Sequence, residues 1–267
     1  MNKRLFLYLL LPLSALLLVA CGNQRHQPAP PNPIVLNENA KYDPKSAAES
    51  NTELGINYMR QGRYAVALDK LNKALEQDSK NPMAHTAMAL LNEHLGKKTE
   101  VEPHYKKALS LEPDNSATHN NYAAFLCSQG RMAEAETHFQ TALANPLYKT
   151  PELAYTNAGL CAVRFNKRNK AMDYFRKALQ HNPNIARALY QMAELYEEQG
   201  AFTEAQAYYR RYIAIASQTP QSLWLGVRIA RALNDKDAEA SYALQLKSRY
   251  PEANETYQLK QSEQIYY

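Results

Sequence analysis

Seven histidines and three cysteines are the residues of this 267-residue chain with the side-chain chemistry for metal binding or nucleophilic attack. No catalytic pattern surrounds them, because the chain contains no HExxH, no GxSxG, no phosphate-binding glycine loop and no paired-cysteine redox motif. His85 and His119 lie 34 residues apart, as do His104 and His138. A regular repeat in the sequence explains these positions, and neither pair has the close spacing that is typical of metal ligands. We therefore expect no enzyme activity, no metal and no cofactor.

Cys21 follows an N-terminal segment with the features of an export signal. Two basic residues precede an apolar run over residues 5–18. The run continues into Leu18-Val19-Ala20-Cys21-Gly22, which resembles a bacterial lipobox. We expect 1–20 to be a signal peptide and Cys21 to be acylated; the alternative is a transmembrane anchor, which needs roughly 20 apolar residues. In that lipoprotein family an Asp after the cysteine usually means inner-membrane retention, so Gly22 implies the outer membrane.

Residues 21–46 are polar and rich in proline, and they contain too few apolar residues to fold. This composition predicts a disordered tether behind the lipidated cysteine. Loss of Lys3 and Arg4 with the signal peptide lowers the formal charge from +5 to +3. That charge, together with the lack of a basic run interleaved with aromatic residues, predicts no nucleic-acid partner.

Beyond the tether, apolar residues at helical spacing predict two helices between Asn81 and Asn115. The first stripe is Ala87, Met88, Leu91 and Leu95, and the second is Val101, Tyr105, Ala108 and Leu109. Gly96 suits the left-handed residue after a helix end, and Pro113 cannot continue the second helix. The segment therefore reads as an antiparallel helical hairpin.

The hairpin pattern recurs along the chain. Small residues that let two helices pack closely recur in steps of 34, 34, 36, 34 and 35, at Ala67, Val101, Ala135, Ala171, Ala205 and Ala240. Larger apolar residues follow four positions later, at Leu71, Tyr105, Phe139, Phe175, Tyr209 and Leu244. The breaks between helices contain residue types that tolerate left-handed backbone, namely Gly62, Gly96, Gly130, Asn166, Gly200 and Asp235. Six hairpins are thus predicted over 47–267.

This period and pattern resemble the tetratricopeptide repeat. The resemblance implies an all-α superhelix, or solenoid, of about six helix pairs, in which the first helix of each pair lines a concave groove. Neighbouring pairs share a core, because a single pair cannot bury its apolar face. Two extra residues near Pro146 predict a longer turn after the third repeat. The sixth repeat is degenerate around Trp224-Leu225-Gly226, so we expect it to cap the stack.

Cys127 and Cys161 are 34 residues apart and fall late in the first helices of the third and fourth repeats. We expect these helices to be parallel neighbours. In an oxidising compartment the two thiols can form a disulfide, provided that their α-carbons approach within about 7 Å. The alternative is a pair of buried thiols that pack as small apolar groups.

The repeat register predicts groove-facing residues in the third, fourth and fifth repeats. They are Asn120, Asn121, Ala124, Thr156, Asn157, Leu160, Arg164, Tyr190, Glu194 and Glu197. Asn121 and Asn157 share a position at which the family often binds a peptide backbone; hydrogen bonds to neighbouring turns are the alternative. This mixture of apolar and polar groups favours a peptide or helix as ligand. Tyr174 and Tyr208, on the opposite surface, are a second candidate for anchors, with inter-helix packing as the alternative.

The acylated N-terminus, the tether and the six repeats together resemble the type IV pilus biogenesis lipoproteins, the pilotins of the pilus secretin. The resemblance covers essentially the whole chain and is densest in 57–64, 120–127, 155–161 and 223–231. It implies a monomeric, non-enzymatic factor that binds the secretin subunit and promotes its localisation and multimerisation in the outer membrane. Pilus assembly and twitching motility would depend on it. The alternative is a general periplasmic scaffold lipoprotein for cell-wall or porin assembly machinery.

Overall fold

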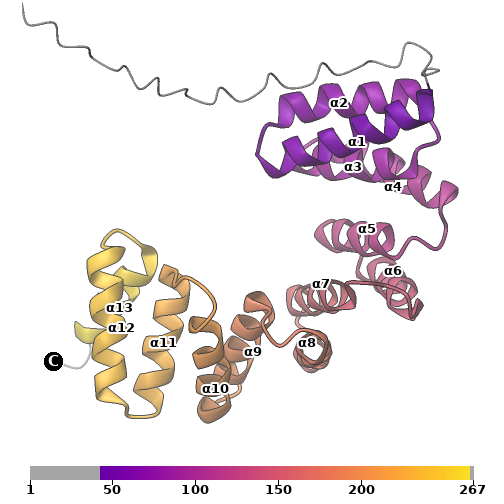
Figure 1. Ribbon diagram of the computed structural model, residues 1–267. Helices are drawn as coiled ribbons and strands as arrows, with labels where there is room; N and C mark the ends of the chain where they lie inside the picture. The colour runs from indigo at the N-terminus through magenta and orange to yellow at the C-terminus, as the bar shows by residue number, and fades with distance from the viewer. Residues whose placement is uncertain (1–42, 265–267) are drawn as a thin grey trace, which may run out of the picture. The chain divides into compact units, whose positions relative to one another are not determined.

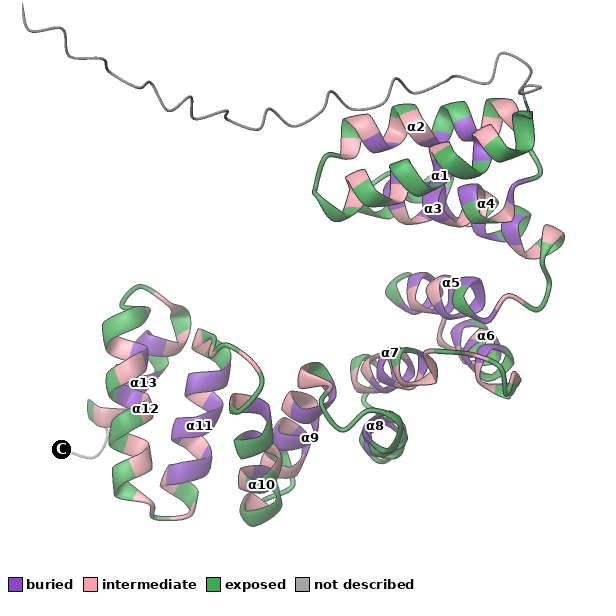
Figure 2. Ribbon diagram, viewed as in Figure 1, coloured by how far each residue is buried: buried purple, intermediate pink, exposed green. Residues whose placement is uncertain are grey.

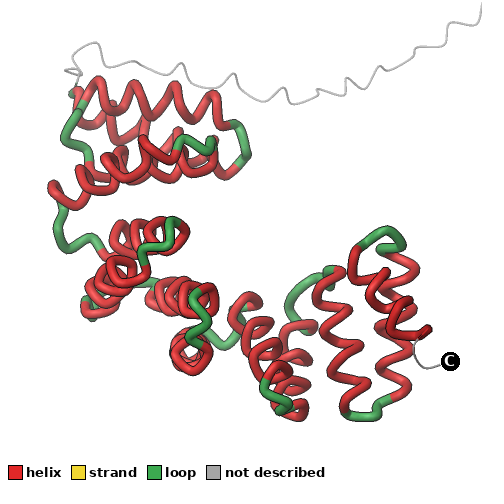
Figure 3. The backbone as a smooth tube through the Cα atoms, turned by 180° about the vertical axis from the view of Figure 1, so that it is seen from behind, coloured by secondary structure: helices red, strands yellow, loops and turns green. Residues whose placement is uncertain are grey.

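Thirteen α-helices account for most of residues 43–264, the part of the chain that this computed structural model describes, and no strand occurs among those residues (Figure 1, Figure 3). The predicted all-α solenoid is confirmed. The predictions for the signal peptide 1–20, for acylated Cys21 and for the tether up to residue 42 lie outside the described residues. The first helix begins at Pro44, a few residues before the predicted start of the repeats, with the Asp43 side chain accepting from the Lys45 and Ser46 amides.

The first twelve helices form six antiparallel hairpins. They are α1 (Pro44–Arg60) with α2 (Tyr64–Gln77), α3 (Pro82–His94) with α4 (Lys98–Leu111), α5 (Ser116–Ser128) with α6 (Met132–Ala144), α7 (Pro151–Arg164) with α8 (Arg168–His181), α9 (Ala186–Glu198) with α10 (Phe202–Ile213), and α11 (Pro220–Ala232) with α12 (Lys236–Arg249). The turn between α6 and α7 spans 145–150 and is two residues longer than the turn at 112–115 between α4 and α5. This is the longer turn that the sequence predicts.

A residue with positive φ joins the two helices of every hairpin. Five of these residues are the predicted ones: Gly62, Gly96, Gly130, Asn166 and Gly200. In the sixth hairpin Asn234, with φ of 57°, takes this role instead of the predicted Asp235. The left-handed residue reverses the chain within a few residues, so the second helix of each hairpin packs directly against the first.

In the first five hairpins the predicted small residue of the second helix and the larger apolar residue four positions later are buried, whereas of the stripes predicted between Asn81 and Asn115 Leu109 is only half-buried and Leu95 is 38% exposed. Val101, Tyr105 and Ala108 illustrate the stripe in α4, each no more than 1% exposed. A buried aromatic ring such as Phe175 contributes roughly 1.5–3 kcal/mol through the apolar surface that it removes from water. These positions therefore hold each second helix in register against its own first helix and against the next hairpin.

The predicted register of α12 is wrong by one residue. Ala240 is exposed and Leu244 is 68% exposed, whereas Ala243 and Leu246 are buried. The cause is the turn at Asn234, which lies one residue earlier than the predicted break and rotates the whole second helix by one position. The sequence pattern was misleading because the sixth repeat lacks the aromatic residue that marks the register in its neighbours.

Two glycines of first helices let a buried aromatic ring of a second helix approach closely. A Cβ atom at Gly159 in α7 would lie 2.5 Å from the ring of Phe175 in α8. A Cβ atom at Gly226 in α11 would lie 2.5 Å from the Tyr209 hydroxyl of the preceding hairpin. Large buried aromatic rings thus occupy the space that a side chain on the first helix would otherwise fill.

Successive hairpins stack, and buried residues line the sides by which they meet (Figure 2). Each first helix after α1 packs against the second helix of the preceding hairpin, and α1 with α3, α5 with α7, α7 with α9 and α9 with α11 are also in contact. The apolar core consequently runs from hairpin to hairpin instead of forming one centre, as expected for a solenoid. None of the helices within 43–264 has the length and hydropathy needed to cross a membrane.

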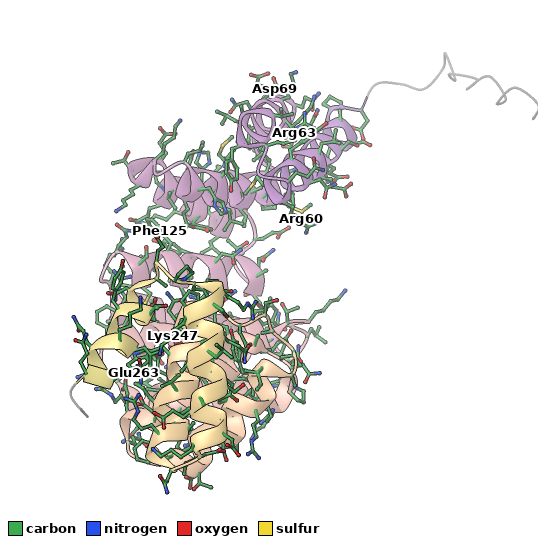
Figure 4. All side chains as sticks on the ribbon, turned by 90° about the vertical axis from the view of Figure 1, so that its left-hand side faces the viewer. Arg60, Arg63, Asp69, Phe125, Lys247 and Glu263 are labelled. Atoms are coloured by element: carbon green, nitrogen blue, oxygen red, sulfur yellow. A yellow bond between two sulfur atoms is a disulfide. The ribbon has the colours of Figure 1, made fainter. Side chains whose placement is uncertain are left out.

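A thirteenth helix, α13 (Asn254–Gln264), follows the sixth hairpin and was not predicted. It packs on α11 and α12 and buries Leu259 and Thr256 completely. Lys247 of α12 and Glu263 of α13 form an ion pair at 2.7 Å beside this contact (Figure 4). The helix covers the apolar end of the sixth hairpin, so the cap of the stack consists of α11, α12 and α13 together.

Candidate protein-binding site

The first helices, α1, α3, α5, α7, α9 and α11, carry all ten predicted groove residues, which lie on α5, α7 and α9. We call the surface that these helices form the first-helix face. Four of the ten residues meet in one cavity, three others form a cluster between α9 and α11, and Asn120 and Thr156 are buried. Asn121 is half-buried outside both groups. The structure therefore divides the predicted groove into parts with different chemistry.

The cavity has a volume of about 400 Å³ and is shared by α5, α7 and α9. We call it the arginine pocket. It is lined by Ala124, Cys127, Ser128, Asn157, Leu160, Cys161, Val163, Arg164 and Arg187. Arg187 is the charged lining residue that the sequence prediction missed. It lies in the first turn of α9, before the positions on which that prediction relied.

The predicted disulfide pair forms one wall of the arginine pocket. In the structure a disulfide joins Cys127 to Cys161, with 5.8 Å between the α-carbons. The bond links α5 of the third hairpin to α7 of the fourth. Because it crosses the boundary between two hairpins, it restrains the spacing of the helices that line the pocket.

Asn157 donates from Nδ2 to Asn120 Oδ1 at 3.1 Å, and this bond also joins α7 to α5. Asn120 is 4% exposed and has no surface for a ligand. Thr156, also buried, donates to the Glu152 carbonyl of its own helix. The sequence left two roles open for the repeat asparagines, namely binding a peptide backbone or bonding within the protein. Asn157 makes a bond within the protein, between two repeats. Its place in the lining of the pocket still leaves its amide beside any ligand there.

Tyr190, Glu194 and Glu197 form bonds within α9 and between α9 and α11. Tyr190 and Gln191 both donate to Glu194, and burial raises the pKa of that carboxyl above its usual range. Arg228 of α11 donates twice to Glu197, at 2.9 and 3.1 Å. Both carboxylates are therefore engaged by groups of the chain itself, and this part of the predicted groove is an inter-repeat contact.

A second cavity of about 310 Å³ lies between α1 and α3. We call it the apolar pocket. Its lining residues are Ile56, Met59, Arg60, Met83, Thr86, Ala87, Leu90 and His94. Met83 is 46% exposed. Arg60, at the end of α1, is exposed and donates to Asn57 of its own helix (Figure 4).

The sequence prediction missed this pocket although the signal was present. Ile56 and Leu90 precede the predicted residues Ala124 and Leu160 by whole repeats, in steps of 34, 34 and 36. Continuing the same register toward the N-terminus would have identified both. An exposed methionine beside branched aliphatic side chains suits a flexible apolar binding surface.

The periodic histidines form two pairs, each of which joins the two helices of one hairpin. The Nδ1 atoms of His85 and His104 lie 3.0 Å apart, and those of His119 and His138 lie 2.7 Å apart. The Nε2 atoms of His85 and His119 face the carbonyls of Ser79 and Pro113, so in the neutral rings Nε2 carries the proton. Each Nδ1 of these two rings is then an acceptor for its partner. Burial lowers the pKa of His104 and His138, which favours the neutral state.

The two tyrosines suggested as anchors on the opposite surface are only half exposed. Tyr174 donates to Glu136 of the preceding hairpin, and the ring of Tyr208 stacks on Tyr196 with 5.5 Å between centroids. Inter-helix packing, the alternative reading, accounts for both.

Comparison with known proteins places this geometry in a family. Models described as tetratricopeptide repeat match residues 48–81, 84–115, 104–137 and 162–224. The chain is 32% identical over 210 residues to the type IV pilus assembly protein PilF of Pseudomonas aeruginosa, covering 77% of this chain and 81% of PilF. The chain belongs to the PilF family of tetratricopeptide-repeat proteins.

Two solved structures of PilF-like proteins extend the match to three dimensions. The structure of Pseudomonas aeruginosa PilF has a TM-score of 0.77 at 33% identity and covers 83% of this chain and all of that one. The structure of PilW, described as a widely conserved type IV pilus biogenesis factor, has a TM-score of 0.73 at 30% identity, with coverage of 79% and 97%. The PilF family thus uses a non-enzymatic protein-interaction fold.

Proposed function

We propose that this protein is an outer-membrane lipoprotein of type IV pilus biogenesis that binds the pilus secretin subunit and promotes its localisation and multimerisation. Similarity to PilF and PilW supports the role in pilus biogenesis. The observation that carries the proposed binding is the pair of cavities on the first-helix face, one apolar and one with two arginines. Such cavities are suited to side chains of a protein segment.

The mechanism is capture by a preformed surface. The helices that bear the cavities are held by the apolar core, the disulfide and the inter-repeat bonds, so little conformational entropy is lost when a segment docks. A Leu-sized side chain that enters the apolar pocket would contribute about 1.5–3 kcal/mol. Specificity would come from the polar groups farther along the face.

Acylation of Cys21 and a tether of about 20 residues complete the proposal. Anchoring the chain to the membrane on which the secretin assembles raises the effective concentration of the two partners, so a modest affinity suffices. Cys21→Ala should leave the repeats folded and mislocalise the secretin. Normal secretin rings in the outer membrane of that mutant would contradict the anchoring step.

The binding step is tested by placing a charge in the apolar pocket. Met83→Glu changes a side chain that is already 46% exposed, so the fold is retained and only the apolar lining is lost. The matched control is Leu244→Glu, at a 68% exposed position on the second helix α12. We expect Met83→Glu to weaken binding of the purified secretin subunit by about tenfold or more, and to reduce secretin multimers and twitching motility, whereas Leu244→Glu should do neither.

Two results would count against the proposal in different ways. Equal secretin binding by Met83→Glu and wild type would remove the apolar pocket from the interface. Failure of the wild-type protein to bind secretin, with capture of cell-wall or porin assembly proteins instead, would replace the proposed function by that of a general envelope scaffold.

A further inference from the structure

The arginine pocket contains two positive charges and no carboxylate. Arg164 ends α7 and Arg187 lies in the first turn of α9, and both side chains are exposed. Among the described residues neither arginine has a carboxylate within ion-pair distance. Some arginines at other inter-repeat contacts are neutralised, for example Arg131 by Glu102 and Glu134 and Arg228 by Glu197.

The acidic residues nearest along the first-helix face do not compensate this charge. Glu194 accepts from Tyr190 and Gln191, and Glu197 accepts from Arg228 of α11. The Glu197 carboxylate is thereby held between α9 and α11, and the Glu194 carboxylate is engaged within α9. The uncompensated charge on this stretch of the face is therefore positive and lies at the pocket.

The pocket is also organised before a ligand arrives. Arg164 donates from Nη2 to the Ser128 carbonyl at 3.2 Å, which positions its guanidinium at the wall and leaves Nε and Nη1 without an acceptor among residues 43–264. The Cys127–Cys161 disulfide restrains the two helices on either side. Leu160 and Val163 supply an apolar wall, beside which a charge-assisted hydrogen bond is stronger than in open water.

We infer that the arginine pocket binds a carboxylate of a protein partner, flanked by an apolar side chain that contacts Leu160. The inference rests on the proposed function, since it names the chemistry of the segment that docks on the first-helix face. Guanidinium groups pair with carboxylates through two parallel N–H···O bonds, and the cavity of about 400 Å³ has room for a few side chains. The carboxylate can belong to an Asp or Glu side chain or to a C-terminus.

Three fluorescent peptides distinguish these sources of the carboxylate. The first contains Leu and Glu and has both ends blocked. The second has Gln in place of every Glu. The third is the Gln peptide with a free C-terminal carboxylate. Binding to the purified full chain is measured by fluorescence anisotropy at low and at high salt. We expect the Gln peptide with blocked ends to bind about tenfold more weakly than a peptide that carries the recognised carboxylate, and this difference to shrink at high salt.

The protein side is tested with Arg164→Gln/Arg187→Gln. The matched control is Lys107→Gln/Arg210→Gln, which removes two exposed positive charges from the second helices α4 and α10. Neither double variant replaces a buried side chain, so both should fold. We expect the pocket variant to lose about tenfold in affinity for the acidic peptide and for the purified secretin subunit, and the control variant to lose less than about twofold.

The outcomes separate this inference from the proposed function. If secretin binds the pocket variant as tightly as wild type, or if blocked Glu and Gln peptides and the free-carboxylate peptide bind alike, the carboxylate site is wrong and the proposed function stands. Equal losses in both double variants would show a general charge effect and also refute the site. If wild type binds the acidic peptide but not secretin, the site stands and the proposed partner is wrong.

Discussion

Removal of the Cys127–Cys161 disulfide should strongly destabilise the middle of the solenoid. The bond closes a loop of 34 residues that spans the six-residue turn between α6 and α7. In the chain-entropy description, closing such a loop in the unfolded state is worth about 4 kcal/mol at 25 °C. We expect Cys127→Ala/Cys161→Ala to lower the free energy of unfolding by about 2–4 kcal/mol, since buried alanines retain part of the packing.

The assay is urea unfolding of the purified protein, followed by far-ultraviolet circular dichroism with and without a thiol reductant. Mass spectrometry first establishes that the wild-type chain lacks the two thiol hydrogens. The reductant should shift the wild-type transition to that of the double variant. It should leave the double variant unchanged, which controls for any effect of the reductant on the rest of the chain.

Two results would refute this reasoning. Unfolding free energies of wild type and double variant that agree within about 0.5 kcal/mol would mean that stacking between the third and fourth hairpins holds the junction without the covalent bond. A wild-type mass that includes both thiol hydrogens would mean that the cysteines are buried thiols in the native protein.

The other predictions concern buried polar groups. Asn92 is 1% exposed, both polar atoms of its side chain lack a hydrogen-bond partner within the described part of the chain, and its equivalent one repeat later is the buried Leu126. Asn92→Leu should therefore raise the free energy of unfolding by about 1–3 kcal/mol, and a lower melting temperature would contradict this. Burial lowers the pKa of His104 and His138 below the usual 6.5, so the unfolded chain binds more protons in mild acid. The stabilisation that these neutral histidines provide should be fully present above about pH 6.5 and should be lost as the pH falls through their lowered pKa values. Melting temperatures recorded between about pH 4 and 8 test this, since that is roughly the range of histidine titration. The variant His104→Gln/His138→Gln should show a smaller decline in melting temperature toward acid pH.

The repeat period was sufficient to predict most of the fold. A hairpin has one left-handed residue between its helices and one buried stripe on each, and both features depend on local spacing. Gly96, Val101 and Tyr105 therefore have the predicted roles in the structure. The pattern failed where the local signal weakened: α12 is rotated by one residue because its turn is at Asn234, and α13 has no counterpart in the repeat.

The candidate site was less accessible to sequence reasoning, because a groove position only says which way a side chain points. Glu197 and Arg164 were both predicted to face the groove. The Glu197 carboxylate is nevertheless neutralised by the guanidinium of Arg228 on the next hairpin. Arg187 lies outside the predicted positions and nevertheless completes the arginine pocket. Which charge remains unpaired depends on residues more than 20 positions away in the chain, and no periodicity encodes that.

The sequence by itself determined the all-α class, the turns of the first five hairpins and the neighbouring placement of Cys127 and Cys161, since each follows from helical spacing and a period of about 34 residues. Only the tertiary structure decided that the first-helix face contains two separate cavities and that one of them brings together two arginines from different hairpins with no carboxylate in its lining. The physical reason is that a cavity and an ion pair both depend on the packing of side chains from different hairpins.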